Sequence, residues 1–223
     1  MQIVAGRKTE ELGADAFRAL AVQHRLTLLD IGSGDGAFPY RVAGTHADVL
    51  CVGVDPNRDG LAEYAAKARH KPARGGRSNV LYIAAAVEAL PDELAAAADL
   101  ITINFPWASL LSLILNNETT LTAALRHVAR DPWALQILLN AEAPPPPLDI
   151  ELGVLTAADV RTRLDPALGS ASVSALPDAA HVGSRWGGRL IRGSDRTIIR
   201  VRADFGAVPA EYGALLDAAV GLE

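Results

Sequence analysis

The sequence predicts an α/β fold: a doubly wound, mostly parallel sheet of seven strands with helices on both faces. Short apolar runs alternate with segments of helical periodicity through the middle of the chain, and such alternation implies right-handed parallel crossovers. The first apolar run, residues 26–29, leads directly into a turn with three glycines. At 223 residues, half of them hydrophobic, the chain is long enough to bury one good core. We therefore expect a single domain over residues 1–223.

The individual elements follow from apolar periodicity and from turn residues. Residues 1–24 are expected to form a small hairpin, with its turn near Gly6, and then a helix over 15–24. The seven strands are expected over residues 26–30, 49–55, 79–85, 99–105, 133–139, 171–176 and 197–203. Further helices are expected over residues 38–45, 61–69, 109–115, 119–129, 156–164 and 209–222. Linkers at 141–195, with four consecutive prolines at 144–147, carry the expected substrate loop, because prolines continue neither strand nor helix.

The composition gives no sign of a membrane span, a signal peptide or a metal centre. No apolar stretch is long enough to cross a bilayer. The single cysteine, Cys51, lies in an apolar run and is expected to be a buried strand residue. One cysteine forms neither an internal disulfide nor a zinc cluster, and the five histidines show no ligand spacing. We therefore expect a cytoplasmic protein without a metal.

The stretch Asp30–Gly36, Asp-Ile-Gly-Ser-Gly-Asp-Gly, is the candidate cofactor loop. Its three glycines are Gly32, Gly34 and Gly36. Residues without a Cβ permit the sharp turn and let a ligand touch the backbone, while the following helix points its first N–H groups at that ligand. Dinucleotide loops have the spacing G-x-G-x-x-G and bind a pyrophosphate. Here the spacing is G-x-G-x-G, and Asp30 and Asp35 are poor neighbours for a pyrophosphate.

These carboxylates suit S-adenosylmethionine better than NAD, because the methyl donor offers an ammonium, a sulfonium and ribose hydroxyls. Asp55 ends the second expected strand and is placed to accept both ribose hydroxyls. Glu88 follows the third strand, where a carboxylate can accept the amino group of the cofactor's adenine. Two alternatives stay open: a glycine turn with ordinary helix-capping aspartates, and, for Glu88, a position on a surface helix.

Basic side chains gather in two stretches although the net charge is −5. Residues 66–78 hold Lys67, Arg69, Lys71, Arg74 and Arg77 without an acid. Residues 182–202 hold Arg185, Arg189, Arg192, Arg196, Arg200 and Arg202 against Asp195 alone. Such a basic face on an acidic body is typical of local phosphate binding. The alternative on charge alone is two solvated loops with no partner.

Aromatic residues mark the candidate substrate side. Asn104–Trp107, Asn-Phe-Pro-Trp, follows the fourth expected strand, where enzymes that methylate exocyclic amino groups of bases carry Asn/Asp-Pro-Pro-aromatic; Phe105 makes that match incomplete. Trp107 is placed to hold a base beside the methyl donor. Trp133 opens the fifth strand and is expected in the core. Trp186 lies in an arginine-rich, glycine-flanked loop, which favours a stacking surface for a nucleobase over a packing role.

These motifs together resemble one family. The shared stretches are Asp-Ile-Gly-Ser-Gly-Asp-Gly at 30–36, Val-Asp-Pro at 54–56, Lys-Pro-Ala-Arg-Gly-Gly at 71–76, Ser-Asn-Val-Leu-Tyr at 78–82, Ala-Leu-Pro at 89–91, Phe-Pro-Trp-Ala-Ser-Leu-Leu at 105–111 and Arg-Trp-Gly-Gly-Arg-Leu at 185–190. The chain is similar to the aminoglycoside-resistance methyltransferases of the kanamycin–apramycin type, which modify N1 of adenine 1408 in 16S rRNA. The resemblance implies the Rossmann-like fold of class I S-adenosylmethionine-dependent methyltransferases and aminoglycoside resistance.

The resemblance also implies site residues and partners. Cofactor-binding positions would be Asp30, Gly32, Gly34, Gly36, Asp55, Pro56, Val87, Glu88, Asn104, Phe105, Pro106, Trp107, Ser109 and Ser184. Trp107 and Trp186 would clamp a flipped adenine as the catalytic pair. Phosphates of the 30S subunit would contact Lys67, Arg69, Lys71, Arg74, Arg185, Arg189, Arg192 and Arg196. We expect a monomer that acts on 16S rRNA. Two alternatives stay open: a methyltransferase that acts on another RNA or on a small molecule, and a cofactor-binding homologue with little 30S activity.

The chain departs from the family pattern at four places. Ala108 stands where the family has Gly. The proline linker 144–147 and the region 149–180 match weakly, and the tail 209–223 has no counterpart. These segments help to determine the conformation of the loop that carries Trp186. The departures therefore concern, above all, the closure of that loop on the ribosome.

Overall fold

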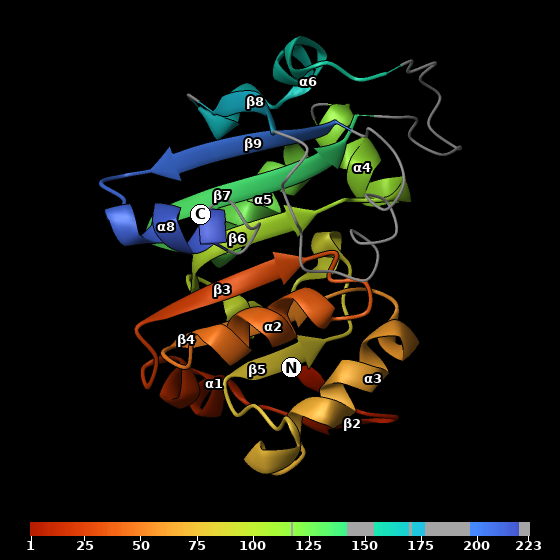
Figure 1. Ribbon diagram of the computed structural model, residues 1–223, viewed down its shortest axis with the longest axis vertical. Helices are drawn as coiled ribbons and strands as arrows, with labels where there is room; N and C mark the ends of the chain where they lie inside the picture. Colours follow the sequence, from red (N-terminus) through yellow and green to blue (C-terminus); the bar gives the residue numbers. More distant parts are fainter. Residues whose placement is uncertain (117, 142–153, 170, 177–196, 219–223) are drawn as a thin grey trace.

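A twisted nine-stranded sheet forms the centre of the molecule in the computed structural model, which describes residues 1–116, 118–141, 154–169, 171–176 and 197–218 (Figure 1). The strands are β1 (Gln2–Ala5), β2 (Lys8–Glu11), β3 (Leu26–Ile31), β4 (Val49–Val54), β5 (Val80–Ile83), β6 (Ala98–Asn104), β7 (Ala129–Asn140), β8 (Ser172–Leu176) and β9 (Ile198–Phe205). Their order is β2-β1-β5-β4-β3-β6-β7-β9-β8. The five central strands, β5 to β7, are parallel, and both edges are antiparallel.

All seven expected strands are present, but the expected number was wrong because the N-terminal hairpin joins the sheet. β1 and β2 pair through a turn at Gly6, and β1 then pairs with β5 at Ile3 and Ile83. Ile3 and Val4 are buried, so this short edge adds both hydrogen bonds and apolar contacts. β7 also begins four residues earlier than expected, and the register of β6 against β7 shifts between Ala98 and Leu100.

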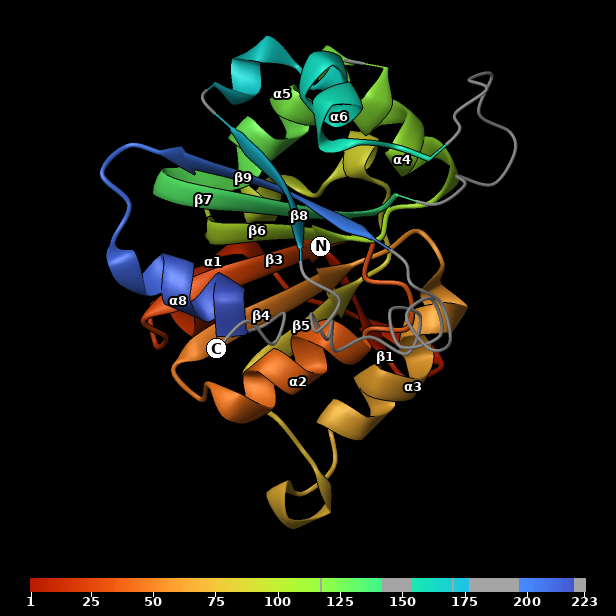
Figure 2. The ribbon, with the colours of Figure 1, turned by 45° about the horizontal axis from the view of Figure 1, so that its top comes forward.

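Helices cover both faces of the sheet, as Figure 2 shows. They are α1 (Ala14–Ala21), α2 (Ala37–Thr45), α3 (Arg58–Ala68), α4 (Ala108–Leu115), α5 (Thr119–Val128), α6 (Ala157–Arg163) and α8 (Ala210–Ala218), with short 3-10 turns at 72–74, 87–89, 92–94 and 166–168. One buried cluster joins α1, α4, α5 and α6 to the sheet, and a second joins α2, α3 and α8 to its other face. Among the helices in the described part of the chain, none combines the length and apolar character that crossing a membrane requires.

Alternation along the central strands decides which side chain faces which layer. Leu26 and Leu28 of β3 pack on the α2 side, whereas Leu29 and Ile31 pack on the α4 side. Asp30 continues the first series, so its carboxylate lies on the α2 side at the carboxyl end of β3. This places the polar end of the strand beside the glycine loop that starts α2.

Two sequence-based assignments to the core are confirmed. Cys51 is fully buried in β4, and burial raises the pKa of its thiol. Trp133 is buried and stacks on Phe205 of β9, with the ring centroids 3.9 Å apart and the planes 7° from parallel. The helix expected over 156–164 is also present as α6, and Thr156 caps it through a capping box with Asp159.

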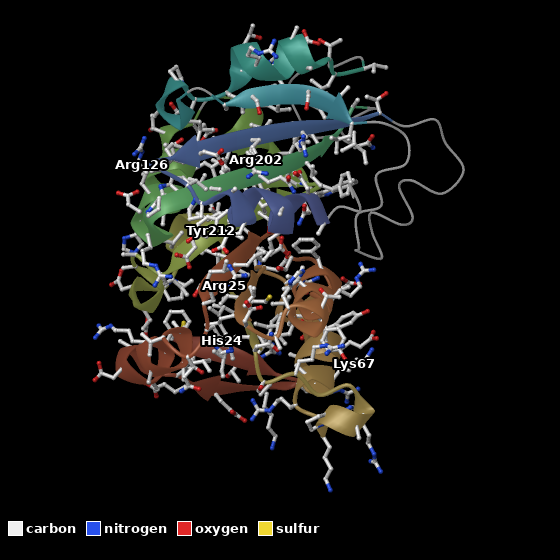
Figure 3. All side chains as sticks on the ribbon, turned by 60° about the vertical axis from the view of Figure 1, so that its left-hand side comes forward. His24, Arg25, Lys67, Arg126, Arg202 and Tyr212 are labelled. Carbon is white, nitrogen blue, oxygen red and sulfur yellow. The ribbon has the colours of Figure 1, made fainter. Side chains whose placement is uncertain are left out.

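The C-terminal helix α8 is held on the sheet by apolar and polar contacts. Leu215 and Leu216 are buried in the same cluster as α2. The Tyr212 hydroxyl donates to Oδ1 of the buried Asp99 at 3.3 Å, and Arg25 forms an ion pair with Glu211 at 2.8 Å. Figure 3 shows Arg25 and Tyr212 near this junction. The helical pattern of the tail is thereby confirmed for residues 210–218.

Candidate cofactor site

A cavity of about 450 Å³ opens at the carboxyl ends of β3, β4 and β6, on the side of α2. Ligands of doubly wound folds bind at such ends, near the switch in strand order, and here β3 is the strand from which the order runs in both directions. The cavity is lined by Asp30, Gly32, Ser33, Gly34, Asp35, Phe38, Asp55, Pro56, Asn104, Phe105, Pro106, Trp107, Ala108, Ser109 and Leu110. It therefore unites the glycine loop, the acid after β4 and the stretch after β6.

Asp30 is the buried polar centre of the site. Its carboxylate accepts hydrogen bonds from Ser33 Oγ at 2.6 Å, Thr102 Oγ1 at 2.8 Å and Asn104 Nδ2 at 2.9 Å. Burial raises the pKa of Asp30 to about 6; the three hydrogen bonds oppose that rise, and the charge of Asp55 adds to it. The carboxylate is thus oriented by its neighbours and is predominantly ionised at neutral pH.

Asp55 fixes the glycine loop. Its Oδ2 accepts the backbone N–H of Gly34 at 2.8 Å, and its Oδ1 accepts the N–H of Asn57 at 2.8 Å. Burial raises the pKa of Asp55, and these two hydrogen bonds oppose the rise. Gly34 has a φ of +59°, a conformation that side chains with a Cβ rarely adopt. Asp55 therefore holds the turn in shape as well as lining the cavity.

The stretch after β6 forms the opposite wall with a strained backbone. Phe105 has a φ of +52° and Ala108 a φ of +46°, both unusual for residues other than glycine. Phe105 is buried, whereas Trp107 is 52% exposed although it lines the cavity. The strained backbone thus turns one aromatic side chain inward and leaves the next one at the rim.

The residues present fit S-adenosylmethionine. Asn104 Oδ1 is buried without a hydrogen-bond partner among the described residues, and Asn104 lines the cavity. A donor is therefore lacking beside Asp30, and an ammonium group supplies donors of that kind. Asp55 provides carboxylate oxygens at the next strand end, where ribose hydroxyls would donate. No lysine or arginine lines the cavity among the described residues, which disfavours a pyrophosphate.

Ten of the fourteen expected cofactor positions lie together in the cavity wall: Asp30, Gly32, Gly34, Asp55, Pro56, Asn104, Phe105, Pro106, Trp107 and Ser109. Gly36 is the N-cap of α2 and instead faces Tyr82: the Tyr82 hydroxyl donates to its carbonyl at 2.8 Å, and a Cβ there would lie 2.5 Å from the ring. Val87 is buried in the core and Glu88 is exposed on a 3-10 turn, and neither is part of the described lining. The cofactor roles of all fourteen residues stay predictions, and for these three the cavity lining adds no support.

Several expected positions lie outside the described residues. They are Ser184, Arg185, Trp186, Arg189, Arg192 and Arg196, together with the proline linker 144–147. The paired indoles of the expected clamp are therefore represented by Trp107 alone.

The basic loop at 66–78 is described, and three of its five cations, Lys67, Arg69 and Arg77, already have partners. Lys67, on the last turn of α3, is labelled in Figure 3. Its Nζ lies 4.8 Å from the ring centroid of Tyr40. Arg69 donates through Nη2 to both carboxylate oxygens of Glu10 on β2, at 2.7 and 2.8 Å. Lys71 and Arg74 are exposed, the latter on the 3-10 turn at 72–74. Lys67, Arg69, Lys71 and Arg74 thus lie within the short stretch 67–74, and Glu10 partly neutralises Arg69 there.

Sequence reasoning missed Thr102, Ser33 and Gly53 as parts of the site. Thr102 lies opposite Asp30 in the register of β3 and β6, and Gly53 lies opposite Asp30 in β4. A Cβ at Gly53 would lie 2.8 Å from Ser33 Oγ, so the glycine makes room for the Ser33 hydroxyl. Only the pairing of strands reveals Thr102 and Gly53, for which the spacing of residues along the chain contains no signal. Ser33, by contrast, lies within the Asp30–Gly36 loop itself, three residues after Asp30.

Comparisons with known proteins agree with this geometry. The model of the NpmA family, 16S rRNA (adenine(1408)-N(1))-methyltransferase, matches residues 2–205. The enzyme of that name from Streptoalloteichus hindustanus is 36% identical over 148 residues, which are 66% of this chain and 68% of the relative. The one from Escherichia coli is 34% identical over 130 residues, 58% of this chain and 59% of the relative.

Solved structures show the same likeness over nearly the whole chain. A variant of the 16S rRNA (adenine(1408)-N(1))-methyltransferase from Catenulisporales acidiphilia, with its cosubstrate SAM, superposes with a TM-score of 0.83 at 30% identity, covering 92% of this chain and 97% of that one. The antibiotic-resistance methyltransferase Kmr superposes with a TM-score of 0.74 at 35% identity, covering 93% and 100%. The chain belongs to the 16S rRNA (adenine(1408)-N(1))-methyltransferase family, with the α/β fold and the S-adenosylmethionine dependence of its members.

Proposed function

We propose that this protein transfers the methyl group of S-adenosylmethionine to N1 of adenine 1408 in the 16S rRNA of the 30S subunit, and thereby gives aminoglycoside resistance. The observation that carries the proposal is the cavity in which Asp30, Asp55 and the Asn104–Trp107 wall meet, in a chain of this family. The cosubstrate supplies an electrophilic methyl on a sulfonium. The chain's own residues orient it: Asp30 and Asn104 receive the ammonium, and Asp55 receives the ribose hydroxyls.

The reaction needs positioning more than proton transfer. Adenine N1 is neutral and already has a lone pair, so its attack on the methyl group needs no general base. The base must instead be extruded from the helix and held in line with the methyl group. Trp107, half exposed at the cavity rim, is placed to stack on that base. The methylated adenine is cationic, and an indole face stabilises the developing charge.

We assign the second face of the base to Trp186 and the grip on rRNA phosphates to the basic residues. Those in the described loop are Lys67, Arg69, Lys71 and Arg74, and those of the sequence beyond it are Arg185, Arg189, Arg192 and Arg196. In this proposal the protein acts as a monomer in the cytoplasm, where 30S subunits are found. Gly36, Val87, Glu88 and Ser184 are assigned to the cofactor on the family resemblance alone.

Methyl transfer to purified 30S subunits tests the proposal. Label from S-adenosylmethionine should enter the 16S rRNA with the unaltered chain. Trp107→Ala should lower the rate by at least about fivefold while cofactor affinity changes far less, since a lost stacking contact is worth about 1–3 kcal/mol. Trp107→Phe retains a ring and should keep most of the rate. Cofactor binding without label transfer to 30S would instead favour another substrate or a cofactor-binding homologue.

A further inference from the structure

Thr102 contacts Asp30 of the cofactor site but does not line the cavity. It lies on β6 in register with Asp30, its side chain is completely buried, and its Oγ1 donates to Asp30 Oδ1 at 2.8 Å. Ser33 and Asn104, the other two donors to this carboxylate, line the cavity, whereas Thr102 is not among its lining residues. Thr102 therefore touches the acid without being placed to touch a ligand.

The charge of Asp30 depends on these donors. Within the described residues Asp30 forms no ion pair, and it is 1% exposed. The titratable groups that face it are Cys51 from β4, Asp55 directly after β4, and Tyr82 from β5. Burial raises the pKa of the Cys51 thiol and of the Tyr82 hydroxyl, so both are neutral at physiological pH, and Asp55 repels a second negative charge. Hydrogen bonds are thus what stabilises the ionised form.

The geometry points to Thr102 as a positioning residue for the cofactor, whose hydroxyl keeps the Asp30 carboxylate ionised and aimed at the cofactor's ammonium. The inference rests on the proposed function, because it assumes that Asp30 receives that ammonium. It adds a consequence: cofactor affinity should depend on pH with a midpoint that Thr102 sets. Burial already raises the pKa of Asp30 to about 6, so loss of one donor brings the transition close to neutral pH.

The test measures binding of S-adenosylhomocysteine, which retains the ammonium, by calorimetry between pH 5.5 and 8.5. Thr102→Val removes the hydroxyl at nearly constant volume and should move the midpoint upward by about one pH unit. Binding would then be about fivefold weaker than that of the unaltered chain at pH 6 and nearly equal to it at pH 8.5. Thr102→Ser keeps a hydroxyl and should restore the original midpoint.

Thr27→Val is the matched control. Thr27 is also a buried threonine, on β3, but its Oγ1 has no hydrogen-bond partner among the described residues. The same substitution there should leave the pH profile unchanged. Should Thr102→Val fail to fold, as judged by circular dichroism, Thr102→Cys provides a weaker donor of similar size and should give a smaller upward shift.

Two results overturn the inference. One is an unchanged midpoint in Thr102→Val, and the other is a loss of affinity that is equal at every pH, which a purely structural role would give. Failure of the unaltered chain to bind S-adenosylhomocysteine at any pH would instead overturn the proposed cofactor, and is thereby distinguished from both.

Discussion

Asp30 is a buried carboxylate, and burial disfavours its ionised form. Its pKa is raised by burial to about 6 from an ordinary 3.8, a difference of about 3 kcal/mol between the two protonation states. Because the folded-state pKa is above the unfolded one, protonated Asp30 favours folding below about pH 3.8, and this contribution is lost as the pH rises through about 6. At neutral pH the ionised carboxylate therefore destabilises the cofactor-free protein.

Asp30→Asn should accordingly stabilise the fold while it weakens cofactor binding. The amide is neutral, so the unfolding midpoint at pH 7 should rise by a few degrees relative to the unaltered chain. The gain should shrink as the pH falls toward 4, where Asp30 is protonated in the folded protein. Thermal unfolding at several pH values checks this, with calorimetry for the cofactor. A stability loss at pH 7 would show that the hydrogen bonds outweigh the cost of burial.

Ala108 has a strained backbone, because its φ of +46° is unfavourable for a residue with a Cβ. Ala108→Gly should raise the free energy of unfolding by up to about 1 kcal/mol, the relief of strain exceeding the entropy that glycine adds to the unfolded chain. The control is Ala123→Gly in the middle of α5, exposed and helical, which should lower it by about 1 kcal/mol. Equal losses in denaturant unfolding would contradict the strained backbone.

At the scale of elements, sequence patterns located the strands and most helices of the described residues to within a few residues. Apolar runs such as 26–29 and 49–54 identify buried parallel strands because both of their faces are covered. The patterns did not reveal that β1 would extend the sheet at β5, since pairing of an edge depends on a distant partner. Asp55 and the loop glycines could be predicted because they stand in a motif along the chain. Thr102 and Gly53 could not, because only the register of β3 against its two neighbours places them beside Asp30.

The β1–β2 hairpin contacts the basic loop through Glu10, whose carboxylate accepts two hydrogen bonds from Arg69. Glu10→Gln should free this arginine and remove a negative charge near the proposed rRNA contact. We expect 30S binding to strengthen by about two- to fivefold at low salt, because an exposed pair is worth only about 0.2–1 kcal/mol. Glu11→Gln is the control, since Glu11 forms no ion pair in the described part of the chain. Equal effects of the two changes in a filter-binding assay would remove the specific role of Glu10.

At the scale of the whole molecule, a chain of net charge −5 is proposed to bind a polyanion through a local basic face. Its affinity for 30S subunits should therefore fall steeply with added salt, as counterions are released from the phosphates that the cations neutralise. A plot of log affinity against log salt concentration should have a slope of about −3 or steeper if four or more phosphates are contacted. A flat plot would contradict binding through Lys67, Arg69, Lys71 and Arg74.

The proposed reaction modifies one base, adenine 1408. A methyl group on N1 blocks the Watson–Crick edge of adenine, so reverse transcriptase should stop next to nucleotide 1408. Primer extension on 16S rRNA from 30S subunits treated with the protein and S-adenosylmethionine should show that stop, and subunits treated without the cosubstrate should not. Cosubstrate turnover on 30S without a stop at adenine 1408 would contradict the account.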